Sequence, residues 1–563
     1  MNNRTIRWLY TVSGRTKWNI LFLIIVEALH GASGVFYALL LRNIVDAAIA
    51  SDIQLFRRNA LLIILLVAAQ LMLRAVLRFL NELTRSTLEN RFKKRLFHTL
   101  LIKDYAAVTA IHSGEWMNRL TNDAQLVANS CVEILPGLFG MAVKLISAFV
   151  MMIILDPKFA ALLLPAGLIL GGFSLLLRRH VKRLHKNVQE KDGKLRIFLQ
   201  ERLSSLLILR AFSAREQTEA EAQERMQVHK AARMRQNRFS NMGNVGLGIA
   251  VQGMYLFAVI WCGYGILTKR ITYGTLTAMT QLITQIQAPF ANITGYLPRW
   301  YAMLASAERL MEAESFEEEL SEEPDSFAEV TRYYHENFAS LCAKHVSFSY
   351  PDPDRERNAD VLRDLSVSIQ KGEILALTGQ SGCGKSTFLK LLLSIYRPQE
   401  GELLLENRDG SLTELSPRQR RLFAYVPQGN QLLQGTIRDA VSFSDPAAAS
   451  DEARLWEALK LACAEDFVRT LENGPDTLLG ERGAGLSEGQ LQRLAIARAV
   501  FAGSPILLLD EATASLDGET EKRLLENLRK LTDKTVLIVT HRPAALSICD
   551  RVLHFSEQGI AER

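Results

Sequence analysis

Long apolar runs alternate with charged stretches over the first half of this 563-residue chain. A bilayer core of about 30 Å needs roughly 20 apolar residues in a helix. Six segments meet that length and are expected to cross a membrane: 18–41, 60–82, 134–155, 158–178, 245–267 and 274–298. The third and fourth are joined only by the tight turn at 156–158. The pattern predicts an all-α transmembrane domain over residues 1–306.

The links between these spans are unequal. Two of them, at about 83–133 and 179–244, are long, charged and helical in pattern, so they extend the membrane helices into the cytosol. An extension of about 25 residues reaches about 40 Å at 1.5 Å per residue. Such stalks are typical of a membrane protein that contacts a cytosolic domain.

Charge predicts the orientation of the spans. Arg4, Arg7, Arg15 and Lys17 precede the first span with no acid among them. The positive-inside rule therefore places the N-terminus in the cytoplasm, and an even number of spans returns the C-terminus there. The apolar run from Trp18 is too long for a cleavable signal peptide.

Composition narrows the function classes. Hydrophobic residues make up 48% of the chain and charged residues 22%, with a net charge of only +6. The basic residues gather at the ends of apolar segments, which favours membrane orientation over nucleic-acid binding. Six cysteines without a CxxC pair argue against disulfides or a zinc site.

Four ionisable residues lie inside the predicted spans: Glu27, His30, Arg74 and Lys144. Charges at bilayer depth are costly and face a partner or a cavity. Glu27 would pair with Lys144 or Arg74 to hold the helices together, or the group would line a polar substrate path. The two interpretations are compatible. Such a path would also include three polar residues of the sixth span: Gln281, Gln285 and Asn292.

The sequence changes character after the sixth span. Residues 307–337 are strongly acidic and predict a solvated linker. An alternating strand pattern starts near Phe338, so residues 338–563 form the soluble domain, with α/β character.

The first chemical motif is a Gly-rich loop that follows an apolar strand and opens a helix, the context required of a P-loop. Its backbone would wrap phosphates, Lys385 would reach the β/γ oxygens, and Ser386 would ligate Mg²⁺. The expected ATP-binding residues are Gly379, Gln380, Ser381, Gly382, Cys383, Gly384, Lys385, Ser386 and Thr387.

A second motif is the buried strand pattern SPILLLDEAT, which ends in two acids. Asp510 suits the Mg²⁺ shell, and Glu511 suits polarising the attacking water. Two adjacent acids on so apolar a strand fit poorly with a merely capping role.

With these motifs the chain resembles an ATP-binding cassette (ABC) exporter half-transporter of bacterial type: six membrane helices fused to an α/β P-loop NTPase domain. The resemblance covers nearly the whole chain. The signature LSEGQ comprises Leu486, Ser487, Glu488, Gly489 and Gln490, with Glu488 where glycine is commonest. The resemblance implies ATP and Mg²⁺ as cofactors, with Glu511, His541 and Gln428 catalytic, and Gln428 also at the metal. It further implies that Asp517 communicates across a dimer and that Tyr350 stacks on adenine.

The membrane half carries the resemblance too. Residues 113–124 resemble the family's first intracellular loop and residues 201–217 the second, in which Phe212 is the expected coupling contact. GERG at 480–483 resembles a loop of exporters that typical importers lack.

Two Gly-rich loops in one chain need an explanation, and the resemblance supplies it. In such cassettes the P-loop of one subunit faces the signature of its partner across ATP. A second half-transporter is therefore expected. A homodimer is favoured because the catalytic positions are intact, and pairing with a different, partly degenerate chain is the alternative.

The expected function is ATP-driven export across an inner or plasma membrane by a multi-pass protein in contact with lipid. Uptake through the same architecture and an ATP-gated channel or sensor are the alternatives. The substrate is left open between lipids, drugs and peptides, and nucleic acid is not an expected partner.

Overall fold

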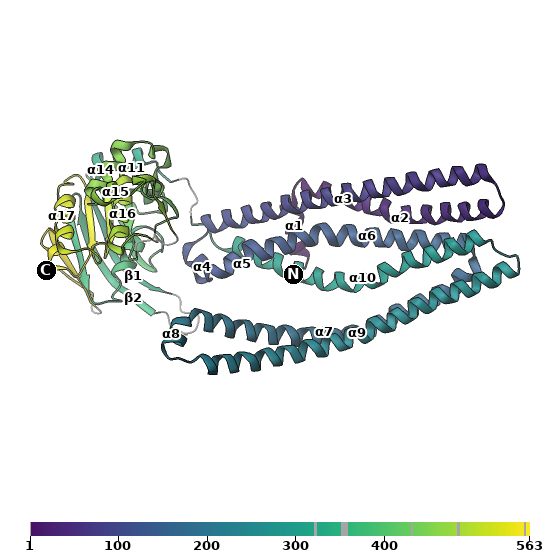
Figure 1. Ribbon diagram of the computed structural model, residues 1–563. Helices are drawn as coiled ribbons and strands as arrows, with labels where there is room; N and C mark the ends of the chain where they lie inside the picture. Colours follow the sequence, from purple (N-terminus) through teal and green to yellow (C-terminus); the bar gives the residue numbers. More distant parts are fainter. Residues whose placement is uncertain are drawn as a thin grey trace. The chain divides into compact units, whose positions relative to one another are not determined.

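The structure is a computed structural model that describes residues 2–319, 324–350, 359–429, 432–480, 485–556 and 559–562. It gives the backbone alone for 2, 163–182, 244, 247, 251, 287–294, 297, 359–360 and 559–560. The chain folds into two compact units, Met1–Phe97 with Gly114–Glu312 and His98–Ser113 with Ala313–Arg563 (Figure 1). Each unit is described by itself.

The first unit is helical. Its long helices lie side by side, α2 against α6 and α10, and α7 against α9 (Figure 1). The elements are α1 (Asn2–Ser13), α2 (Thr16–Ile49), α3 (Ile53–Ile102, whose last turns belong to the second unit), α5 (Ser113–Asn118), the π-helical turn η1 (Arg119–Asp123), α6 (Ala124–Leu155), α7 (Pro157–Ser204), α8 (Leu206–Ala211), α9 (Arg215–Leu267) and α10 (Tyr273–Glu312).

Each predicted span lies within one of these helices, and the predicted stalk extensions are helical. Among the described residues, four helical runs are long and apolar enough to cross a membrane: Thr16–Ile49, Ile53–Ile102, Ser113–Leu155 and Arg215–Leu267. The spans at 158–178 and 274–298 fall in α7 and α10, where many side chains lie outside the described residues.

The predicted turn between the third and fourth spans is confirmed. Asp156 caps α7 by accepting hydrogen bonds from the N–H groups of Lys158 and Phe159, and Pro157 occupies the first turn, where its missing N–H costs nothing. The same buried carboxylate accepts from Trp261 Nε1 at 3.0 Å and pairs with Arg270 at 2.9 Å. The turn is therefore tied to the end of α9.

Three of the polar residues predicted to line a substrate path, Glu27, His30 and Lys144, lie where α2 contacts α6. A Cβ on Gly31 would lie 2.7 Å from the Gly140 carbonyl, so the two helices touch through glycine. Arg74 donates to His30 Nε2 at 3.3 Å. Among the described residues Glu27 forms no ion pair with Lys144 or Arg74, so that predicted pairing is wrong.

The three polar residues of the sixth predicted span differ in their surroundings. Gln285 is 7% exposed and donates to the Gly34 carbonyl at 2.7 Å, so part of its amide holds α10 against α2. Gln281 is half-buried. The side chain of Asn292 lies outside the described residues.

The second unit contains two main sheets. A six-stranded sheet has the order β12-β11-β3-β10-β9-β6 and is parallel except for β12, and an antiparallel sheet has the order β2-β1-β4-β5. The strands are β1 (Phe338–Tyr350), β2 (Ala359–Gln370), β3 (Ile374–Gly379), β4 (Glu400–Asn407), β5 (Leu412–Glu414), β6 (Phe423–Val426), β7 (Gly435–Thr436), β8 (Leu478–Leu479), β9 (Ile506–Asp510), β10 (Thr535–Val539), β11 (Arg551–Ser556) and β12 (Gly559–Glu562).

Helices accompany the sheets in this unit. They are α4 (Tyr105–Ala110), α11 (Phe327–Glu336), α12 (Lys385–Leu392), α13 (Ile437–Val441), α14 (Glu452–Leu461), α15 (Glu465–Thr470), α16 (Glu488–Phe501), α17 (Gly518–Arg529) and α18 (Pro543–Leu546).

The central strands are buried on both faces, as their unbroken apolar runs require. Successive side chains enter different hydrophobic clusters: Leu507 and Leu509 join one, and Ile506 and Leu508 join the other. The signature helix α16 packs in the first cluster and the P-loop helix α12 in the second. The two helices therefore cover opposite faces of the sheet.

The predicted solvated linker at 307–337 is partly folded. Its second half forms α11, which starts with a capping box between Ser326 and Glu329. Val330 and Tyr334 are buried in the cluster that contains α12, and Tyr334 hydrogen-bonds Thr535 at 2.8 Å. The acidic composition concealed an amphipathic helix whose apolar face belongs to the second unit.

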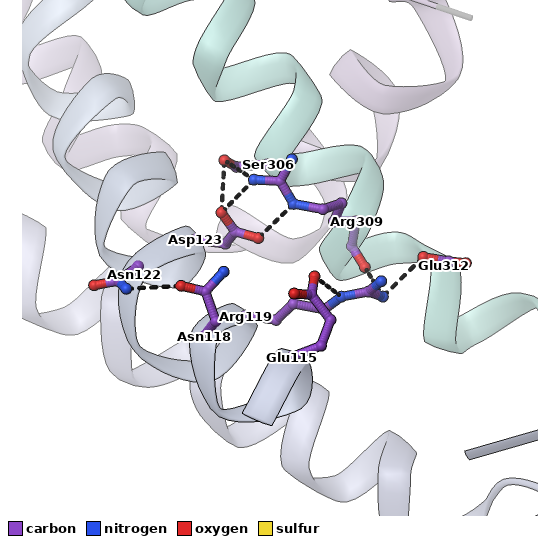
Figure 2. A network of polar contacts seen from close by, with 8 residues as sticks. All are labelled: Glu115, Asn118, Arg119, Asn122, Asp123, Ser306, Arg309 and Glu312. Atoms are coloured by element: carbon purple, nitrogen blue, oxygen red, sulfur yellow. Dashed lines mark hydrogen bonds and ion pairs between the residues drawn. The ribbon is translucent and has the colours of Figure 1, made fainter. Parts of the chain in front are cut away.

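A polar network with a buried centre joins the π-helical turn η1, just before α6, to the end of α10 (Figure 2). Asp123 is nearly buried, and its two oxygens accept hydrogen bonds from Arg309 at 2.6 and 2.8 Å. Ser306 donates to the same carboxylate at 2.8 Å. This bidentate geometry is the strong form of an ion pair.

The other half of the network centres on Arg119. Its guanidinium donates to the Arg309 carbonyl at 3.0 Å and pairs with Glu312 at 2.8 Å and Glu115 at 3.2 Å. It also lies over the Trp116 ring. Arg119 and Asp123 bound the π-helical turn η1, and both side chains point toward α10 in Figure 2. Single π turns are frequent at functional sites.

We expect Arg309→Met to destabilise the first unit, because it leaves the Asp123 carboxylate buried without its cation. The lost charged hydrogen bonds are worth about 1.5–3 kcal/mol. The matched control is Arg299→Met on the same helix, whose pair with Glu133 is exposed on both sides. An exposed pair contributes about 0–1 kcal/mol. Denaturant unfolding of the detergent-solubilised protein measures both, and equal losses would contradict the network's role.

Candidate functional site

The predicted chemical residues converge at one edge of the six-stranded sheet. The P-loop follows β3, Asp510 ends β9, Gln428 lies just after β6, and His541 lies just after β10. These strands are parallel and adjacent in the order β3-β10-β9-β6, so their carboxyl ends meet. In open α/β sheets, ligands bind outside this edge.

The P-loop adopts the backbone that its glycines predict. Gly379, Gly382 and Gly384 all have positive φ values, between 84° and 134°. A Cβ on Gly379 would lie 2.1 Å from the Phe555 carbonyl, and one on Gly384 would lie 2.5 Å from Leu362. Glycine is therefore required at both positions by conformation and by space.

Lys385 begins α12 and is only 6% exposed. Its ammonium donates to the carbonyls of Gly379 and Gln380, both at 2.7 Å. The cation is thus held inside the loop, where it can compensate the charge of a phosphate. Thr387, two residues further along α12, hydrogen-bonds the Tyr350 hydroxyl at 3.2 Å.

Asp510 is brought against Ser386, as the predicted shared metal site requires. The Ser386 hydroxyl donates to Asp510 Oδ1 at 3.0 Å, and the Tyr425 hydroxyl donates to Oδ2 at 3.3 Å. Burial raises the pKa of Asp510 above its ordinary value, and these two hydrogen bonds oppose the shift. Burial also raises the pKa of Tyr425, so its hydroxyl stays protonated and donating. No sequence pattern pointed to Tyr425.

Glu511 has an unusual backbone. Its φ of +52° is left-handed, a conformation that costs about 1–3 kcal/mol for a non-glycine residue and clusters at functional sites. Its N–H donates to the Val539 carbonyl at 3.1 Å. Gln428 donates from its amide to Glu511 Oε2 at 2.8 Å, so these two predicted catalytic residues lie together.

Gln492, which sequence reasoning missed, supports this strained residue. It is 4% exposed, and its amide donates to the Glu511 carbonyl at 2.9 Å while accepting from the Ser515 N–H at 3.0 Å. The sequence nevertheless contains a signal that Gln492 is buried. Apolar residues follow Gln492 at +3, +4 and +7, which places this amide on the buried face of α16.

The signature forms a capped helix start. Ser487 is the N-cap of α16 and forms a capping box with Gln490. A Cβ on Gly489 would lie 2.9 Å from the Ser515 carbonyl, so this glycine permits close approach of the loop that follows Glu511. Glu488 is exposed in the first turn, and Leu486 packs against the cluster that contains α16. Most of the GERG segment lies outside the described residues.

The remaining predicted residues lie on neighbouring loops. Asp517 is exposed and caps α17, and the hydrogen bonds of Thr520 lower its pKa. His541 is exposed. The next residue, Arg542, was not predicted; it donates to the carbonyls of Ala514 and Leu516 at 2.6 and 3.0 Å. It therefore ties the loop after β10 to the loop that contains Ser515.

Phe212 follows the short helix α8 and is 80% exposed. Leu207 and Ile208 on the same helix are 82% and 58% exposed. The short helix and the residue after it thus present several exposed apolar side chains close together in the sequence.

Comparison with known proteins identifies both halves of the chain. The ABC transporter transmembrane region family matches residues 20–290, and the ABC transporter family matches residues 362–514. A mitochondrial potassium channel ATP-binding subunit of Xenopus tropicalis is 31% identical, over 84% of this chain and 67% of its own length. An ATP-dependent lipid A-core flippase of Pasteurella multocida is 27% identical, over 93% of this chain and 88% of its own.

Among solved structures, a bacterial Atm1-family ABC exporter with ATP bound has the same fold. The TM-score is 0.78 at 22% identity, with 97% of this chain and 94% of that chain covered. The edge-of-sheet site, the membrane helices and the two family matches all point to the same family. The chain belongs to the ABC transporter family, as an exporter-type half-transporter in which an ATP-hydrolysing domain is fused to the membrane domain that it drives.

Proposed function

We propose that two copies of this chain form an exporter with two shared ATP sites, each between the P-loop of one protomer and the signature of the other. The observation that carries this proposal is that α12 and α16 cover opposite faces of one sheet. Each of the two helices begins in a phosphate-binding type of loop. Because one nucleotide cannot contact both faces, a second chain supplies the other wall.

The residues at the sheet edge support specific roles in ATP hydrolysis. Lys385 binds the β/γ oxygens, and Glu511 polarises the attacking water with Gln428 beside it. His541 completes the site from the adjacent strand end. Ser386 and Asp510 present hard oxygen atoms 3.0 Å apart, a donor set that suits Mg²⁺. When bound, the cation neutralises phosphate charge.

Coupling to the membrane helices is the second part of the proposal. ATP binding closes the two cassettes, Asp517 communicates between them, and Phe212 passes the closure to the spans. Hydrolysis then resets the transporter. Such a cycle is two-state switching biased by ligand. The exposure of Phe212 supports its role, since a buried side chain could not contact a partner.

The intact catalytic positions support a homodimer over pairing with a degenerate chain. The positive N-terminal segment supports a cytoplasmic location for both termini. Glu27, His30, Lys144, Gln281 and Gln285 would present polar groups to an amphipathic or cationic substrate. The lipid A-core flippase relative makes a lipid the first substrate class to test.

Transport itself is tested in liposomes with the nucleotide-binding domains outside. External ATP should drive a fluorescent phospholipid or a cationic dye inward against its gradient. Glu511→Gln is the matched control: it should bind ATP yet turn over about 10²–10⁴-fold more slowly, because the positioned base is lost. Its transport should therefore be slowed by about the same factor.

Two other outcomes would contradict export and support one of the alternative functions. Loss of probe from the lumen against its gradient would establish uptake. Dissipation of a preset gradient on ATP binding alone, in Glu511→Gln as well, would establish a gated channel. The second outcome has a precedent in the name of the Xenopus relative.

We expect Gln492→Met to lower ATP turnover by about 10-fold or more with little change in KM. It removes both hydrogen bonds that hold Glu511 and Ser515, each worth about 0.5–1.5 kcal/mol. Gln370→Met, on the exposed end of β2, is the control substitution. Phosphate release measures both variants. A higher KM at unchanged kcat would show that Gln492 supports binding and not the base.

The shared site predicts a disulfide between protomers. Leu486→Cys, with Cys131, Cys262, Cys342, Cys463 and Cys549 replaced, should cross-link to Cys383 of the other copy under mild oxidation. A disulfide needs Cα atoms within about 7 Å, so it forms only where the two loops face each other. The product should run at twice the mass of one chain, with a yield that depends on nucleotide. Bonds formed only within single chains would refute the shared site.

A further inference from the structure

Arg542 directly follows His541 in the loop after β10 and is the N-cap residue of α18. The base of this loop is fixed on the sheet, because the N–H of the buried Thr540 donates to the Leu377 carbonyl of β3 at 3.2 Å. The Thr540 hydroxyl accepts from the Arg542 N–H at 3.1 Å. Consecutive Cα atoms lie about 3.8 Å apart, so a movement of the His541 backbone also moves Arg542.

The Arg542 side chain reaches the loop at 512–517, which leads from Glu511 to α17. Its Nη2 donates to the Ala514 carbonyl at 2.6 Å, and its Nη1 donates to the Leu516 carbonyl at 3.0 Å. A planar guanidinium presents its N–H groups as a rigid fork, which can hold two carbonyls in a fixed relation to each other. The backbone of this loop is therefore attached to the residue next to His541.

A buried carboxylate holds the guanidinium in this position. Glu521 of α17 is 4% exposed and accepts from Arg542 Nη1 at 2.8 Å. Its other oxygen, Oε1, is buried and has no hydrogen-bond partner among the described residues. Because a buried carboxylate without its cation is strongly unfavourable, Glu521 keeps the Arg542 side chain beside the loop.

The 512–517 loop carries the residues that the proposed function turns toward the other protomer. The Ser515 N–H donates to Gln492, and Arg542 holds the carbonyls of the residues before and after Ser515. At the end of the loop, Asp517 caps α17 by accepting from the Thr520 N–H at 2.9 Å. The position of this loop therefore depends on Arg542 as well as on α16.

We propose that Arg542 is a positioning residue that joins His541 to the 512–517 loop, so that contact of His541 with the terminal phosphate in one protomer sets the position of Asp517 toward the other. This inference rests on the proposed places of His541 and Asp517 in the shared ATP sites. It is separate from the support that Gln492 gives to Glu511, because Arg542 acts from the strand end next to the P-loop strand.

The first test measures hydrogen exchange of the amides of the 512–517 loop in the full-length protein. It compares ADP with ADP plus beryllium fluoride, both with Mg²⁺, since the fluoride complex occupies the place of the γ-phosphate. In the native protein this mimic should slow the exchange by about 2–10-fold relative to ADP alone, the range for one hydrogen bond. Equal exchange with the two ligands would overturn the proposal.

Arg542→Lys is the informative variant, because it keeps a positive charge beside Glu521 but lacks the planar fork. It should still bind ADP, as measured by calorimetry, and should lose the slowing by the γ-phosphate mimic. Arg529→Lys, at the exposed end of α17, is the matched control and should behave like the native protein. A purely structural role would speed the exchange equally with both ligands and leave their ratio unchanged, which would refute the proposal.

A double variant keeps the test valid if Arg542→Lys folds poorly. Arg542→Met combined with Glu521→Met removes both charges of the buried pair, a replacement that proteins often tolerate. It should also lose the slowing by the γ-phosphate mimic. Retention of the slowing in the folded double variant would count against Arg542 as the link.

ATP turnover is the second measurement. Arg542→Lys should lower kcat by about 10–100-fold with little change in KM, since displacement of a catalytic group by about 1 Å can cost about 10²-fold. A native kcat in this variant would contradict the positioning role.

His541→Ala separates this inference from the function on which it rests. If the γ-phosphate mimic still slows exchange of the loop in His541→Ala, the proposed place of His541 is wrong and the inference falls with it. If His541→Ala loses the slowing but Arg542→Lys keeps it, the proposed ATP site stands and the role of Arg542 alone is refuted.

Discussion

The parallel sheet of the second unit, buried on both faces, is the constraint on which the ATP site depends. Apolar clusters on its two sides hold β3, β10, β9 and β6 in fixed register. Their carboxyl ends then present four loops to one volume. Because a strand that slid would have to repack the close-packed clusters on both faces, each loop keeps its position. The residues proposed to bind and hydrolyse ATP can therefore lie on short loops at this edge of the sheet.

Strain is concentrated at one of those segments. Glu511 has a left-handed backbone, and its neighbours compensate for it: the sheet through Val539, and α16 through the buried amide of Gln492. The same amide holds Ser515, whose carbonyl closely approaches Gly489 of the signature. The proposed base and the proposed partner-facing loop are thus parts of one hydrogen-bonded assembly. A shift of the signature loop would therefore also shift Glu511, because Gln492 is hydrogen-bonded to both segments.

Side-chain contacts also fix the segments that lie between membrane helices and cassette in the sequence. The Asp123–Arg309 pair holds the end of α10 to the turn before α6. Two edge-to-face aromatic contacts, of Tyr396 with Tyr105 and with Tyr350, hold α4 to the strand that ends in the proposed adenine contact. One device is charged and hydrogen-bonded, and the other is aromatic. Because the Asp123 carboxylate is buried, its hydrogen bonds with Arg309 are stronger than those of an exposed ion pair.

Local sequence determined the elements of this protein. Apolar length predicted the membrane helices, glycines predicted the left-handed turns of the P-loop, and the acids after an apolar strand predicted the positions of Asp510 and Glu511. These features depend on short-range sterics and solvation, so neighbouring residues suffice to specify them.

Only the tertiary structure decided which distant side chains meet: Gln492 with Glu511, Tyr425 with Asp510, Tyr105 with Tyr396. It also decided that the acidic linker ends in a packed helix and that Glu27 lacks the expected ion pair among the described residues. Contacts of this kind arise when separate elements pack together, and no periodicity within either element specifies its partner.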